Sequence, residues 1–102
     1  HLDKRLWRQM MATAFYYAET PIGAGYRALD RELADQVASL CRALQQRGDI
    51  PDRVNSADAG DVLFFACNSL FMEFVADDSI ELAQLKKRMR RQVRLVFDGL
   101  RG

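Results

Sequence analysis

The sequence predicts an all-α fold, an antiparallel bundle of four helices, and three observations support this. Apolar residues recur at spacings of three and four in segments 2–18, 26–47, 57–76 and 80–100. No segment shows the alternation of apolar and polar residues that is typical of a strand. The links are short and hold both prolines, and short links join antiparallel helices.

Composition limits the chain to a single folded domain, residues 1–102. A hydrophobic content of 49% with 28% charged residues argues against disorder. The net charge of +1 indicates no class of partner. Cys41 and Cys67 lie in apolar helical stretches without metal-binding spacing, so we expect free buried thiols and a cytoplasmic protein. No run of about 18 apolar residues occurs, so we expect no contact with a membrane.

Segment 2–18 has a broad apolar face, and segment 26–47 has a narrow one. In segment 2–18, Trp7, Met11 and Phe15 share a face that serves either as core or as the lining of a ligand site. A break is expected at 20–25, where a proline and two glycines lie. In segment 26–47 a single apolar line is expected to be the buried one, and Gly48 is expected to end the helix in the left-handed conformation. That line consists of Tyr26, Leu29, Leu33, Val37, Leu40 and Leu44.

The last two helices carry more apolar surface than one chain is expected to cover. Segment 57–76, capped by Asn55 or Ser56, is apolar on several sides, and a helix of that kind needs several partners. Segment 80–100, capped by Asp78 or Ser79, has one apolar seam and one basic face. We therefore expect these two helices to form a four-helix interface with a second copy. The expected interface residues are Leu63, Ala66, Leu70, Phe74, Leu82, Leu85, Met89, Val93, Val96 and Leu100.

The residues needed for catalysis are largely missing, and we expect a protein that is not an enzyme and holds no metal or cofactor. His1 is the only histidine, and the Glu-x-x-His pattern of di-iron bundles does not occur. A small bundle enzyme that uses carboxylates is the weakest alternative, because the acidic residues are explained by helix capping. The basic run 86–94 is better explained as a solvent-exposed face than as a nucleic-acid site, because no aromatic residue interrupts it.

The order of these features resembles the C-terminal ligand-binding and dimerisation domain of TetR-type bacterial transcription regulators. An early helix contains Trp7, and a long helix ends in the junction Arg47-Gly48-Asp49-Ile50. Residues 56–61, SADAGD, open a strongly apolar helix, and residues 94–100, RLVFDGL, close the chain. The family's N-terminal helix-turn-helix domain has no counterpart here. Because the first residue is not Met, we expect the chain to be a piece of a longer protein.

The resemblance implies a homodimer that binds a small, mostly apolar effector and reaches DNA only through the missing domain. Asn68 is the expected polar anchor of the effector, with a hydrogen-bonded interface role as the alternative. A helical module that binds a partner protein, without any small-molecule site, is the competing hypothesis. The positions that the resemblance implies for the effector pocket are Trp7, Met10, Met11, Phe15, Tyr26, Phe64, Asn68, Phe71 and Met72.

Overall fold

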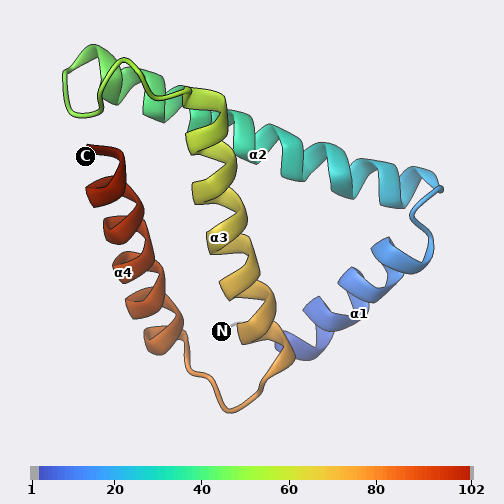
Figure 1. Cartoon of the computed structure of the whole chain (residues 1–102). Helices are drawn as coiled ribbons and strands as arrows, with labels where there is room; N and C mark the ends of the chain where they lie inside the picture. The colour runs from blue at the N-terminus through green and yellow to red at the C-terminus, as the bar shows by residue number, and fades with distance from the viewer. Residues whose placement is uncertain (1–2, 102) are drawn as a thin grey trace.

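The chain folds into four helices, as the sequence predicted. The computed structural model describes residues 3–101, and residue 2, expected in the first helix, lies outside them together with residues 1 and 102. The helices are α1 (Lys4–Tyr16), α2 (Pro21–Gln46), α3 (Ser56–Ala76) and α4 (Leu82–Arg101) (Figure 1). No strand occurs among residues 3–101, and the all-α bundle is confirmed.

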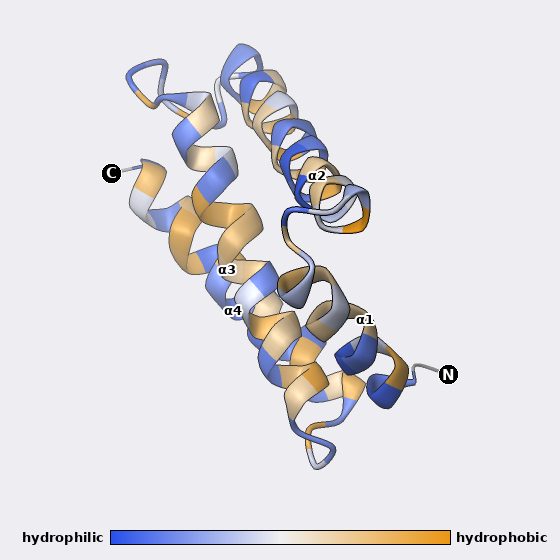
Figure 2. Ribbon diagram, turned by 90° about the vertical axis from the view of Figure 1, so that its right-hand side faces the viewer, coloured by the Kyte–Doolittle hydropathy of each residue, from blue (hydrophilic) through white to orange (hydrophobic). Residues whose placement is uncertain are grey.

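The helices form two layers, with α3 in contact with all three others. α3 and α4 make an antiparallel pair, and α1 and α2 lie together on one side of that pair (Figures 1 and 2). α2 crosses the first half of α3, whereas α1 packs near its C-terminal end (Figure 1). The shortest dimension is 19 Å, which matches two helices of about 10 Å each.

The start of α3 agrees with the prediction from the sequence, whereas the start of α2 does not. The Asn55 side chain accepts from the Asp58 N–H at 3.0 Å and caps α3, one of the two expected caps. The break expected at 20–25 is wrong in extent, because α2 already begins at Pro21 behind the N-cap Thr20. Proline is tolerated at the first helical position, where its missing N–H has no helical partner.

The end of α2 and the start of α4 differ in how well they were predicted. Gly48 has a φ of 84°, the left-handed conformation expected of it, and ends α2. The start of α4 is two residues later than expected, so neither Asp78 nor Ser79 caps it. Instead, the Gln84 side chain accepts from the Glu81 N–H at 2.7 Å.

The face of α2 that is buried is not the leucine line that periodicity selected. Ala34, Ala38 and Cys41 are buried against the rest of the chain, whereas three leucines of the expected line, Leu29, Leu33 and Leu40, are exposed. The physical reason is a close crossing of backbones. A Cβ placed on Gly60 of α3 would lie 2.6 Å from the Ala38 nitrogen, so α2 sits directly on α3 where both carry the smallest side chains.

Basic side chains of α1 hold the C-terminal end of α3. The Lys4 ammonium donates to the carbonyls of Asp77 and Ile80, each at 2.6 Å, and lies 3.9 Å from the centre of the Phe74 ring. Arg8 donates to the Val75 carbonyl at 2.8 Å and to the Asp78 carboxylate at 2.9 Å. Cations at this end satisfy free carbonyls and oppose the negative end of the helix dipole.

The protomer exposes more surface than a self-contained domain of its mass. Its accessible area is 7248 Å², whereas the scaling for monomeric proteins gives about 5,900 Å² at 11.7 kDa. Its radius of gyration is 15.6 Å, against about 13 Å for a typical domain of 100 residues. The excess is partly apolar, because thirteen large hydrophobic side chains are exposed among residues 3–101. This is the property expected of a chain that packs against a partner.

The sequence did not anticipate that α3 is long and apolar enough to cross a membrane. Its 21 residues reach a mean hydropathy of 1.4 over the best window. A central helix of a water-soluble bundle meets the same criterion, and α3 is the helix that contacts all three others. The absence of a membrane partner therefore stays a prediction.

Gly60→Ala is expected to destabilise the fold by about 1–3 kcal/mol, because the new Cβ would collide with the Ala38 backbone. Gly25→Ala is the matched control. Gly25 is also helical but has open space around its Cβ position, so this change should stabilise the fold by about 0.5–1 kcal/mol. Urea unfolding followed by circular dichroism measures both, and equal effects would contradict the close crossing.

The Arg8–Asp78 contact should make the stability of the fold depend on pH in the acidic range. Arg8 donates a hydrogen bond to Asp78, and this together with its charge holds the pKa of that carboxyl below the ordinary value of 3.8. The contribution to stability is therefore present above that value and disappears as the pH falls through the lowered pKa. Asp78→Asn should melt at a lower temperature than the wild type at neutral pH and at the same temperature once the pH is well below the lowered pKa. Asp52→Asn, in the exposed α2–α3 link, should match the wild type throughout.

Candidate functional site

Five of the positions implied for the effector pocket belong to the core at the junction of α1, α2 and α3. Met11 is buried, and the Trp7 ring meets Phe71 edge to face with 5.4 Å between centroids. Tyr26 and Met72 are half-buried against the same cluster. Of the two roles left open for the Trp7 and Met11 face, the structure favours core, because these side chains already contact one another.

Met10 and Phe15 lie at the edge of this core. A shallow hollow of about 270 Å³ between α1 and α2 includes Met10, Ile22 and Tyr26. The Phe15 ring is exposed, 6.5 Å from the Tyr26 ring. Burial, and to a smaller extent the nearby charge of Asp30, raises the pKa of the Tyr26 phenol, which therefore stays protonated at neutral pH.

A deeper apolar hollow lies elsewhere, between α2 and α4 with α3 as its floor. We call it the central groove, and its volume is about 240 Å³. Every lining side chain is apolar or a thiol. The lining residues are Val37 and Leu40 of α2, Leu63, Phe64 and Cys67 of α3, and Val93 and Phe97 of α4. Of the positions implied by the resemblance, only Phe64 lies here.

The groove lies where the backbones of α2 and α4 stay apart. Among the described residues, the helix pairs with Cα atoms within 8 Å are α2–α3, α3–α4, α1–α3 and α1–α2. α3 therefore separates α2 from α4, and Leu40 remains largely exposed on the wall between them.

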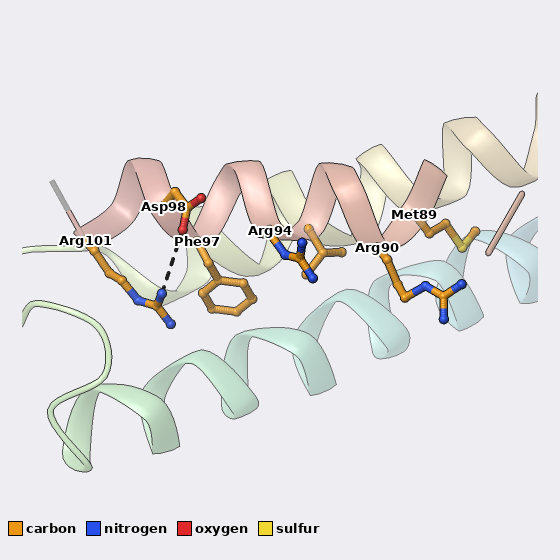
Figure 3. Close-up of a pocket in the computed structure, with 7 residues that line it drawn as sticks. Met89, Arg90, Arg94, Phe97, Asp98 and Arg101 are labelled. Atoms are coloured by element: carbon orange, nitrogen blue, oxygen red, sulfur yellow. Dashed lines mark ion pairs between the residues drawn. The ribbon is translucent and has the colours of Figure 1, made fainter. Parts of the chain in front are cut away.

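The groove continues along α4 into a more polar hollow of about 440 Å³, which shares Val93 and Phe97 with it. Arg90 and Arg94 leave α4 on the same side as Phe97 (Figure 3). Arg101 lies 3.8 Å from Asp98, and this is the ion pair drawn in Figure 3. The combined site has an apolar floor and a cationic rim.

Asn68, the expected polar anchor, lies outside the central groove. Its side chain is half-buried, and its amide nitrogen approaches the Met72 sulfur at 3.9 Å. Thioether sulfur is a weak acceptor. This contact assigns Asn68 neither to a ligand nor to an interface, so both of its predicted roles stay predictions.

Four of the expected interface positions are buried within the chain itself. Leu63, Leu70, Phe74 and Leu85 are each at most 6% exposed and form the protomer's own core. They were selected because they form the most regular apolar stripes, and those stripes face each other within the α3–α4 pair. The other six are half-buried or exposed: Ala66, Leu82, Met89, Val93, Val96 and Leu100.

A different surface of the α3–α4 pair remains uncovered. On α3, Val62, Ala66, Ser69 and Glu73 follow one another at spacings of four, three and four, so they share a face. On α4 the same spacings connect Arg88, Gln92, Leu95 and Gly99. Glu73 and Arg88 pair at 3.0 Å, which puts the two stripes on the same side of the helix pair.

We call this surface the outer face and include Phe65 at its edge, where the ring also lines a hollow with Arg27 and Arg31 of α2. The antiparallel register places Ala66 and Leu95 near its centre. Val62 is 54% exposed, Phe65 47% and Leu95 72%. One feature of the sequence could have indicated the outer face, because Leu95 is an isolated apolar residue on the polar side of α4. The central groove had no such signal, because it depends on the angle at which α2 crosses α3.

Comparison with protein-family models, with curated proteins and with solved structures finds no match to this chain. Within residues 3–101, no three His, Cys, Asp or Glu side chains come together as metal ligands do. The candidate site is therefore defined by its own geometry, as an apolar groove and an uncovered outer face that share α3 and α4.

Cys67 should report on the groove. Cys41 is 1% exposed, whereas Cys67 is half-buried in the groove wall, and burial raises the pKa of both thiols. In native protein, a thiol reagent such as DTNB should modify Cys67 at least tenfold faster than Cys41, and both should react more slowly than free cysteine. Cys67→Ala should remove the faster phase, and equal rates for the two thiols would contradict the assigned burial.

Proposed function

We propose that this chain is the homodimerisation and effector-binding part of a TetR-like transcriptional regulator. The outer face is the observation that carries the proposal. It presents exposed Val62, Phe65 and Leu95 on the two helices that resemble the dimerisation pair of that family.

The outer face has the properties of a surface that packs against its own copy. Small residues, Ala66, Ser69 and Gly99, allow close approach of helix backbones. Two copies related by a twofold axis would bring four helices together, with Leu95 near the axis. The excess accessible surface of the protomer supports the same conclusion, because a dimer would bury it.

The central groove supports the second half of the proposal. Small-molecule sites are concave and mostly apolar, with a few polar groups that orient the ligand. Because the backbones of α2 and α4 have no Cα pair within 8 Å, a ligand between them would favour one spacing of α2 and α4 over another. Differential affinity for two spacings is what couples an effector site to a distant function. DNA would be read by another domain of the full-length regulator, and the cytoplasm is the proposed location.

A helical module that binds a partner protein through the outer face is the second candidate. This candidate accounts for the exposed apolar side chains but does not account for a wholly apolar groove with an arginine rim. The oligomeric state separates the two, because such a module would be monomeric without its partner.

Leu95→Glu is expected to weaken self-association at least tenfold, because it would place two like charges near the twofold axis. Val62→Glu should have the same direction of effect. Sedimentation equilibrium at micromolar concentrations measures the dissociation constant, and circular dichroism verifies that the variants stay folded.

Leu29→Glu on α2 is the matched control, since Leu29 is 52% exposed and lies outside the outer face. It should leave association unchanged. A wild-type chain that is monomeric at these concentrations would overturn the proposed dimer, as would a Leu29→Glu variant that dissociates as far as Leu95→Glu.

A further inference from the structure

The central groove and its rim differ sharply in polarity. The floor consists of aliphatic and aromatic side chains and the Cys67 thiol, and it contains no charged group. The rim along α4 carries three guanidinium groups, those of Arg90, Arg94 and Arg101. A ligand that satisfies both parts has an apolar body and an anionic end.

Two of the three guanidinium groups have no carboxylate partner within residues 3–101. Arg101 lies 3.8 Å from Asp98, so part of its charge is offset, whereas Arg90 and Arg94 make no ion pair there. They lie four residues apart and hence one helical turn from each other on one side of α4 (Figure 3). Guanidinium groups stay charged at all physiological pH values and bind carboxylates through two parallel hydrogen bonds.

The apolar floor begins directly beside these arginines. Val93 and Phe97 line both the groove and the rim hollow, so the two are continuous. Together the groove and the rim hollow follow α4 over residues 89–101, about three turns of helix, and this elongated lining suits an extended chain better than a compact ring system. Each methylene that such a chain buries on this floor adds to its affinity.

We propose that the central groove binds an extended aliphatic monocarboxylate, with its chain on the floor between α2 and α4 and its carboxylate held by Arg90 and Arg94. The inference deepens the proposed effector function, and it names the chemical class of the effector. The groove opens beside Arg90 and Arg94, away from the Arg88 edge of the outer face, so a dimer through the outer face would leave it accessible.

The test compares binding of sodium dodecanoate and of 1-dodecanol, both below their aggregation limits, to the full chain by isothermal titration calorimetry. The two probes share a chain and differ in the charged end. The wild type should bind dodecanoate at least tenfold more tightly than 1-dodecanol. The double variant Arg90→Gln/Arg94→Gln should lose about tenfold or more in dodecanoate affinity, while its affinity for 1-dodecanol should be unchanged.

Two further variants make the result specific. Arg91→Gln removes the same charge from the same helix outside the rim, and it should bind dodecanoate as the wild type does. Leu40→Gln, on the exposed wall of the groove, should weaken both probes by a similar factor. Dodecanoate should also slow modification of Cys67, which lies in the groove wall, without affecting Cys41.

Several results would overturn the inference. These are no binding of dodecanoate, equal affinity for the acid and the alcohol, or an Arg91→Gln variant that loses as much affinity as the double variant. The inference would also be overturned if the protein bound anionic phospholipid vesicles more tightly than it binds monomeric dodecanoate. That result would identify a lipid surface as the source of the anion. If Leu40→Gln dissociates the dimer, the groove is occupied by the second copy and the inference is wrong. The oligomeric state of the wild type is measured separately, so failure here leaves the proposed dimer untouched.

Discussion

The arrangement of this protein depends on the close crossing of α2 and α3 at Ala38 and Gly60. Because only the Ala38 methyl group lies at this contact, the two backbones approach closely and α2 crosses directly over α3. That crossing directs the alanines and Cys41 of α2 inward and leaves its leucines at the surface. It also moves α2 away from α4, so that α3 is left as the floor of a groove. A larger residue at position 60 would remove the geometry on which the candidate site depends.

The helices themselves could be read from the sequence because local signals specify them. Asn55 caps α3 and Gly48 ends α2 through interactions within a few residues of each, and such interactions do not depend on the rest of the fold. The predicted start of α2 is too late, because Pro21 is the first residue of the helix and does not interrupt it. Likewise, the start of α4 depends on Gln84, whose role has no distinctive pattern in the sequence.

The faces that pack could be predicted only in part. Periodicity identified an apolar seam on α4, of which Leu85 is buried and Leu82 is exposed, but it could not tell whether that seam meets its own chain or a second copy. Leu85 is buried by the protomer, so the strongest stripe is internal and the weaker one, around Leu95, is left uncovered. The same difficulty applies to α2, where small residues make the contact although the leucines make the more obvious pattern. A stripe of alanines carries little hydropathy signal, yet it allows the shortest distance between helices.

Lys4 and Arg8 attach the start of α1 to the carbonyls at the end of α3 and to the turn that leads into α4. The first turns of α1 are therefore hydrogen-bonded to a segment about seventy residues later in the chain. A pull or twist applied at residue 3 would load the α3–α4 hairpin directly, with α2 acting as a brace. Through this attachment, a displacement of the start of α1 would change the angle between α3 and α4, the two helices that expose the outer face.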